Sequence, residues 1–142
     1  MRTTLFAALA FGAMLSAGAA LAEVVHFTAN LDGASETPAN TSKGTGTADV
    51  ALDTVTRVLS WKIEYSRLSG PATAAHFHGP AAPGKAAGIT VPLTGDLASP
   101  IKGSVAITDG QIGDLRGGLW YVNIHTAKIP AGEIRGQVLQ AK

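Results

Sequence analysis

The sequence predicts an all-β domain, a sandwich or barrel of about eight short strands with one short helix. Segments in which apolar and polar residues alternate recur along the chain, as half-buried strands require. Turn-forming residues separate these segments, and the 142 residues include 17 glycines and seven prolines. Aromatic residues make up only 6% of the chain, which indicates a small core and argues against a large α/β enzyme.

The first 22 residues have the organisation of a secretory signal peptide. Arg2 precedes an apolar run over residues 5–15, and small residues lead to an Ala20-x-Ala22 cleavage motif. The alternative is a membrane anchor, but the run is shorter than the roughly 20 residues that a span needs. No later segment is apolar for long enough either. We therefore expect a single domain over residues 23–142 that does not span a membrane and is periplasmic or secreted.

Eight segments of this domain are predicted to be strands. They cover residues 24–31, 45–52, 57–65, 73–79, 89–93, 101–107, 119–125 and 133–140. In the first of them, Val25, Phe27 and Leu31 share one face. Thr108 and Gln111 have the spacing of a capping box and a Gly-Gly pair follows Arg116, which predicts a helix over residues 109–116.

The composition excludes several classes of function. The chain has no cysteine, so disulfides, thiolate metal sites and cysteine nucleophiles are absent. Eleven basic residues balance ten acidic ones without a basic run, which argues against a nucleic-acid partner. The Gly-x-Ser-x-Gly elbow of many hydrolases is missing, and Gly44-Thr45-Gly46 lacks the rest of a phosphate-binding loop.

All four histidines fall in predicted strands, on the face that points away from the core. His76 and His78 share that face because Phe77 takes the other, and residues two apart on a strand are about 6.6 Å from each other. His125 and His26 also point outward. His76, His78 and His125 are therefore the main candidate metal ligands, and His26 is a possible fourth ligand. The alternative is that all four are ordinary surface histidines.

The candidate ligands favour copper as the bound ion. An all-imidazole site suits copper, zinc, nickel or iron, while blue copper needs a thiolate that is missing here. Cu(II) binds such sites more tightly than Zn(II), so one copper ion is the first choice and zinc the second. Three histidines also leave a coordination position open for superoxide or another small anion.

A hairpin between the last two predicted strands would place further polar side chains beside His125. If His125 lies opposite Glu133, then Asn123 faces Arg135 and Tyr121 faces Gln137. In this register Glu133 could accept a hydrogen bond from His125, and Arg135 could attract an anion to the metal. The alternative is a cross-strand network of ion pairs on a solvated face.

Four segments resemble the CHRD domain, a family named for chordin. They are residues 27–38 (FTANLDGASETP), 75–80 (AHFHGP), 118–126 (GLWYVNIHT) and 130–137 (PAGEIRGQ), and the resemblance extends over residues 24–140. It implies an immunoglobulin-like or superoxide-dismutase-like Greek-key sandwich or barrel in a secreted protein. Glu36 belongs to the first motif, and we expect it either to reach the histidine site or to stabilise a turn. His26 is outside the family pattern.

The order and faces of His76, His78 and His125 also resemble the copper site of Cu,Zn superoxide dismutases. The chain lacks the additional histidines and the cysteines of the dismutase zinc loop, so the expected site is mononuclear. Three functions stay open. The protein is a copper-dependent superoxide dismutase, a non-catalytic copper-binding or delivery protein served by a copper donor protein, or a structural or adhesive CHRD module without metal.

Overall fold

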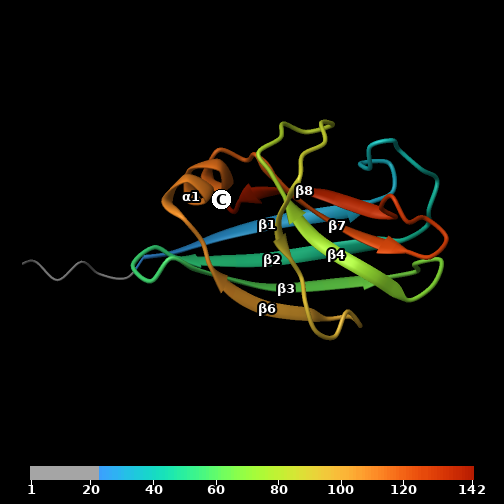
Figure 1. Cartoon of the computed structure of the whole chain (residues 1–142), viewed down its shortest axis with the longest axis horizontal. Coiled ribbons are helices and arrows are strands. Elements are labelled where there is room, and N and C mark those ends of the chain that lie inside the picture. Colours follow the sequence, from blue (N-terminus) through green and yellow to red (C-terminus); the bar gives the residue numbers. More distant parts are fainter. Residues whose placement is uncertain (1–22) are drawn as a thin grey trace, which may run out of the picture.

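The computed structural model describes residues 23–142, and the predicted signal peptide lies outside this range. The described chain is all-β with one short helix, as expected (Figure 1). Its elements are β1 (Val24–Asp32), β2 (Thr45–Asp53), β3 (Val58–Ser66), β4 (Ala72–His78), β5 (Ile89–Pro92), β6 (Ile101–Ala106), α1 (Asp109–Arg116), β7 (Trp120–Thr126) and β8 (Ile134–Gln140). The helix has the predicted bounds, and the Thr108 and Gln111 side chains form the expected capping box.

The eight strands form one antiparallel sheet in the order β5-β4-β7-β8-β1-β2-β3-β6. This sheet curls into a half-barrel, so that β4 crosses in front of β2 and β3 in Figure 1. Trp61 of β3 and Phe77 of β4 are separated by four strands in the sheet order, yet their ring centroids lie 5.5 Å apart. The curl thus brings the two ends of the sheet together around a shared core.

The core lies on the concave face of the half-barrel. Alternate residues of β1, from Val25 to Leu31, are buried there, as the sequence predicts. Phe27, Phe77 and Trp120 are almost completely buried in the same cluster. The outward residues of β4 and β7 are therefore on the opposite, convex face of the sheet.

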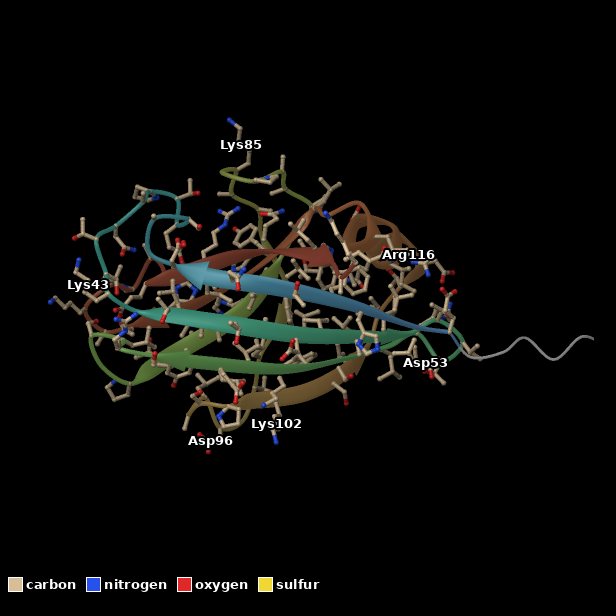
Figure 2. All side chains as sticks on the ribbon, turned by 180° about the vertical axis from the view of Figure 1, so that it is seen from behind. Lys43, Asp53, Lys85, Asp96, Lys102 and Arg116 are labelled. Carbon is tan, nitrogen blue, oxygen red and sulfur yellow. The ribbon has the colours of Figure 1, made fainter. Side chains whose placement is uncertain are left out.

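Two loops cover this convex face over β4, β7 and β8. The 33–44 loop joins β1 to β2, and the 79–88 loop joins β4 to β5. Figure 2 shows them from behind, with Lys43 in the first loop and Lys85 in the second. Under this cover Tyr121 and Asn123 are buried, each with only 4% of its surface exposed. The convex face is therefore not the solvated surface that strand alternation alone suggests.

Candidate metal centre

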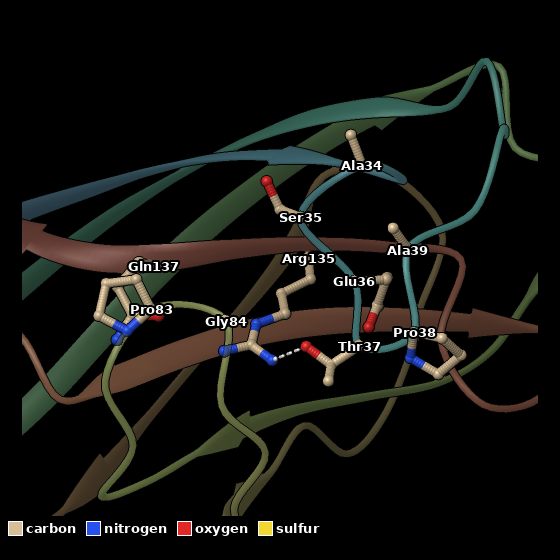
Figure 3. A pocket seen from close by; sticks show the side chains of 10 residues that line it. All are labelled: Ala34, Ser35, Glu36, Thr37, Pro38, Ala39, Pro83, Gly84, Arg135 and Gln137. Atoms are coloured by element: carbon tan, nitrogen blue, oxygen red, sulfur yellow. Dashed lines mark hydrogen bonds between the residues drawn. The ribbon is translucent and has the colours of Figure 1, made fainter.

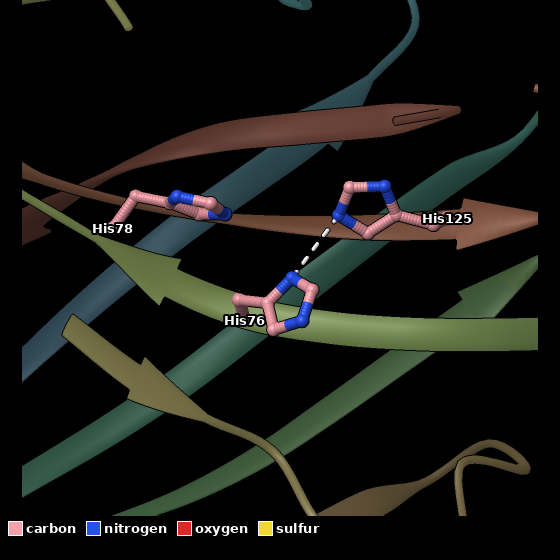
Figure 4. Close-up of side chains that lie close together, drawn as sticks. All are labelled: His76, His78 and His125. Atoms are coloured by element: carbon pink, nitrogen blue, oxygen red, sulfur yellow. Dashed lines mark hydrogen bonds between the residues drawn. The ribbon is translucent and has the colours of Figure 1, made fainter. Parts of the chain in front are cut away.

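Three histidines meet on the convex face, where β4 and β7 lie side by side (Figure 4). One nitrogen from each of His76, His78 and His125 lies within 4.8 Å of the others. His76 Nδ1 and His125 Nε2 are 3.1 Å apart. The pairing of Ala74 with His125 and of His76 with Asn123 places the three rings next to one another. The cluster is therefore a geometrically suitable metal site.

Backbone carbonyls orient two of the rings. His78 Nδ1 lies 3.0 Å from the Ala87 carbonyl oxygen, and His125 Nδ1 lies 2.8 Å from the Pro130 carbonyl oxygen. A carbonyl oxygen only accepts hydrogen bonds, so each ring carries its proton on Nδ1. The lone pair of each neutral ring is then on Nε2, the nitrogen that faces the cluster.

The surroundings favour the neutral form of two of these histidines. Burial lowers the pKa of His76, and the neighbouring His125 and His78 lower it further by charge repulsion. Burial also lowers the pKa of His78, although the Ala87 carbonyl and Asn123 act in the opposite direction. A metal ion binds the neutral imidazole, so these pKa directions suit a metal site.

Tyr121 and Arg135 hold the His78 ring in place from the side. The Tyr121 ring stacks on the His78 ring with 4.7 Å between centroids and an angle of 4° between planes. The Arg135 guanidinium carbon lies 3.5 Å from the centroid of the Tyr121 ring. Arg135 belongs to β8, which pairs with β7 on the side away from β4. His78, Tyr121 and Arg135 thus form a continuous stack across three strands.

Arg135 does not have the environment expected of an anion guide. Its side chain is only 2% exposed, and it donates hydrogen bonds to Thr37 Oγ1 at 3.0 Å and to the Lys85 carbonyl oxygen at 2.7 Å. Figure 3 shows it between the two covering loops, at the edge of a pocket of about 300 Å³. The lining of that pocket, as far as the structure describes it, includes no histidine. Arg135 therefore joins two loops and does not face solvent beside the cluster.

Asn123 lies between the histidines, as its place on β7 suggests. Its Oδ1 atom is 3.0 Å from His78 Nε2 and 3.0 Å from His125 Nε2. The side chain is buried. Asn123 therefore contacts two of the three candidate ligands directly.

Glu36 lies next to Asn123 and approaches the site from the 33–44 loop. Burial raises the pKa of Glu36 to about 7, against the lowering effects of the Thr37 backbone N–H, the Arg135 charge and the Asn123 amide. Its Oε1 atom is buried and has no hydrogen-bond partner among residues 23–142. A Cβ on Gly132 would clash with Oε1 and lie 2.9 Å from Asn123 Nδ2, so only glycine leaves room for both groups.

Glu133 does not accept the hydrogen bond expected from His125. Its carboxylate instead accepts hydrogen bonds from the Ser42, Ser69 and Thr126 hydroxyls, each at 2.6 Å, and from the Ser69 backbone N–H at 2.8 Å. The cause is the backbone before β8, which begins at Ile134 and not at Glu133. Gly132 has a φ of 130°, so the alternation of β8 side chains does not extend back to Glu133.

His26 also lies away from the cluster. It is exposed on β1 and lies near residues of β2 and β3. Within the described residues, the cluster of potential metal ligands consists of His76, His78 and His125 and does not include His26. The register predicted for the last hairpin is correct, since Tyr121 pairs with Gln137 and Asn123 with Arg135. The Ala87 and Pro130 carbonyls were missed, because no sequence pattern indicates where a loop carbonyl points.

Comparisons with known proteins identify one family. The family model for the CHRD domain matches residues 27–138, which include all three clustered histidines. No curated protein and no solved structure matches the chain. Within the described residues, no helix is long and apolar enough to cross a membrane.

Proposed function

Since this chain belongs to the CHRD domain family and has a three-histidine cluster within that domain, we propose that it is an exported copper protein that acts as a superoxide dismutase. The observation that carries the proposal is the convergence of nitrogens from His76, His78 and His125 within 4.8 Å. Export is inferred from the signal-peptide pattern of residues 1–22 and from the secreted character of the family resemblance.

The donor set supports copper over zinc. Three imidazoles are the available ligands, and residues 23–142 contain neither cysteine nor methionine. Nitrogen donors bind Cu(II) more tightly than Zn(II) in the general order of divalent affinities. Zinc remains the second candidate ion. A copper donor protein is the partner that would load the site in the exported compartment.

The residues around the cluster support access by a small anion. His76 and His125 are partly exposed, and three protein nitrogens leave a coordination position open. Copper supplies the redox chemistry, in which one superoxide is oxidised to dioxygen and a second, with two protons, is reduced to hydrogen peroxide. The chain's own residues hold the nitrogens in place, through the Ala87 and Pro130 carbonyls and the Tyr121 ring. Because Arg135 is buried, it acts on an incoming anion only through its charge and not by direct contact.

The first test is metal binding by the protein purified without a histidine tag. We expect one copper ion per chain and a Cu(II) EPR spectrum with nitrogen ligands. His78→Ala should lower copper affinity by at least about 100-fold. Substituting a residue that only hydrogen-bonds to a ligand already lowers metal affinity by about 10–100-fold, and removing a ligand should lower it more. His26→Ala is the matched control, and its affinity should equal that of the wild type because His26 lies outside the cluster. Equal copper binding by both variants would exclude the three-histidine site.

The second test is superoxide turnover by the copper-loaded protein. The rate per copper should exceed that of the His78→Ala protein mixed with the same amount of copper. A loaded protein without such activity would exclude the dismutase and leave copper binding or delivery as the function. A wild type that binds no copper would leave the structural or adhesive module.

A further inference from the structure

The contacts of Asn123 resemble those of a metal ligand. Its Oδ1 atom is 3.0 Å from His78 Nε2 and from His125 Nε2, and His125 Nε2 is 3.1 Å from His76 Nδ1. Donors bound about 2.0–2.1 Å from one ion lie roughly 3 Å from each other at tetrahedral or square-planar angles. Three of the six distances among these four atoms therefore match the spacing of donors around one ion, and one nitrogen of each histidine lies within 4.8 Å of the others.

The chemistry of these atoms favours a positive group between Asn123 Oδ1 and the two Nε2 atoms. The Ala87 and Pro130 carbonyls hold the Nδ1 protons of His78 and His125, so both Nε2 atoms present lone pairs. Asn123 Oδ1 is also an acceptor, and it is buried against both of them. Buried acceptors that face one another without a donor are unfavourable, whereas a cation between them satisfies all of them.

Glu36 explains why the oxygen of the Asn123 amide faces inward. Asn123 Nδ2 and Glu36 Oε1 both point into the space above Gly132, where an added Cβ would lie 2.9 Å from Nδ2 and would clash with Oε1. If the amide were turned around, Oδ1 would face the Glu36 carboxyl group, which repels it when ionised. Glu36 is held in the 33–44 loop, away from the direct reach of the three imidazoles. Its effect on the site therefore passes through Asn123.

We infer that Asn123 is the fourth protein ligand of the site, through Oδ1, and that Glu36 is a positioning residue that keeps this oxygen directed at the metal. The inference rests on the proposed copper function and makes the site three nitrogens and one oxygen, so that a small anion would bind as a fifth ligand of the ion. An amide oxygen is a harder donor than imidazole, so this ligand favours Cu(II) over Cu(I). Asn123 thereby sets the redox preference of the bound ion.

The test compares Asn123→Leu, which removes the oxygen at similar volume, with Asn123→Asp, which retains an oxygen donor. Asn123→Leu should change the Cu(II) EPR parameters. It should lower Cu(II) affinity by about 10-fold or more, as substitutions at metal sites do, and leave Cu(I) affinity nearly unchanged. Asn123→Asp should retain most of the Cu(II) affinity. Glu36→Gln should lower the ratio of Cu(II) to Cu(I) affinity with the four donors still in place, an effect that a purely structural role would not produce.

A measurement on the wild type covers the case in which Asn123→Leu does not fold. On titration with diamagnetic Zn(II), the side-chain amide NMR signals of Asn123 should shift, whereas those of Asn30 should not. Unchanged Asn123 signals in a zinc-loaded protein, or an Asn123→Leu protein with wild-type EPR and affinity ratio, would overturn the inference and leave the three-histidine copper site intact. A wild type that binds neither ion would instead refute the proposed function.

Discussion

At the scale of single residues, hydrogen-bond donors decide how two buried carboxylates ionise. Burial alone would raise the pKa of Glu133, but the Ser42, Ser69 and Thr126 donors outweigh it and lower this pKa to about 2. Burial raises the pKa of Glu36 to about 7, because fewer donors reach it and its Oε1 has no partner in the described chain. Both carboxylates are buried, and the hydroxyl donors around Glu133 have no counterpart around Glu36.

Replacement of Glu133 by Gln should destabilise the protein in a pH-dependent way. The folded pKa of about 2 lies below the ordinary value of 4.5, so ionised Glu133 stabilises the fold above about pH 5. This stabilisation is on the order of 3 kcal/mol and disappears as the pH falls toward 2. Urea unfolding should show a large difference between the variant and the wild type at pH 7 and a clearly smaller one at pH 3. Glu64→Gln is the control, because the exposed pair of Glu64 with Lys62 contributes little at any pH.

At the scale of elements, the stack on β4, β7 and β8 connects the loops to the histidine cluster. Arg135 hydrogen bonds to the 33–44 loop through Thr37 and to the 79–88 loop through Lys85, and it covers the Tyr121 ring. Tyr121 also bonds to the 79–88 loop, since its hydroxyl donates to the Ala87 carbonyl oxygen at 3.2 Å. The same carbonyl orients His78. The position of the 79–88 loop therefore affects the geometry of a candidate ligand.

Arg135→Lys should distinguish a positioning role from anion attraction. Lysine retains the positive charge but lacks the planar guanidinium group, which donates to both Thr37 and Lys85 and stacks on Tyr121. We expect a loss of roughly 2 kcal/mol of stability from weakened charged hydrogen bonds and stacking. Amide hydrogen exchange in the 79–88 loop should become faster, and copper affinity should fall. If the charge alone matters, Arg135→Lys will keep wild-type stability and turnover, while Arg135→Ala will lose the salt dependence of the superoxide rate.

At the scale of the whole molecule, the join between β8 and β1 unites the two halves of the sheet. β5, β4, β7 and β8 lie on one side of this join and β1, β2, β3 and β6 on the other. The ladder between β8 and β1 is interrupted between the pair Thr28–Leu139 and the pair Asp32–Arg135. Gly136 lies in this interval, where the Asn30 backbone comes very close to it. The sheet continues across the join because residue 136 has no side chain.

Gly136→Ala should therefore weaken the fold as a whole. Its Cβ would clash with the Asn30 carbonyl oxygen and lie 2.8 Å from the carbonyl carbon, and these backbone atoms cannot move without shifting β1. We expect a loss of about 3 kcal/mol or more, as for other overpacked interiors. Gly70→Ala is the control, because its Cβ would meet nothing within 4 Å and should change the stability by less than about 0.5 kcal/mol. Equal denaturation midpoints for the two variants would show that the join tolerates a side chain.

The sequence by itself determined the local features of this protein. Alternation located all eight strands and the core face of β1, and the capping residues located α1 with its observed bounds. It also placed His76, His78 and His125 on the same outward side and gave the register of the last hairpin. These features depend on the period of a strand or on the spacing of a few neighbouring residues, so the printed order of side chains is sufficient to predict them.

Only the tertiary structure decided how these elements are arranged and covered. It brought β4 next to β7, curled the sheet, and folded two loops over a face that alternation assigns to solvent. In the folded chain Glu133 accepts hydrogen bonds from three hydroxyls, and Arg135 is buried between two loops. His26 lies away from the cluster, and Asn123 lies between two imidazoles. These outcomes depend on contacts between segments far apart in the chain and on where loop carbonyls point, and no local period of the sequence carries that information.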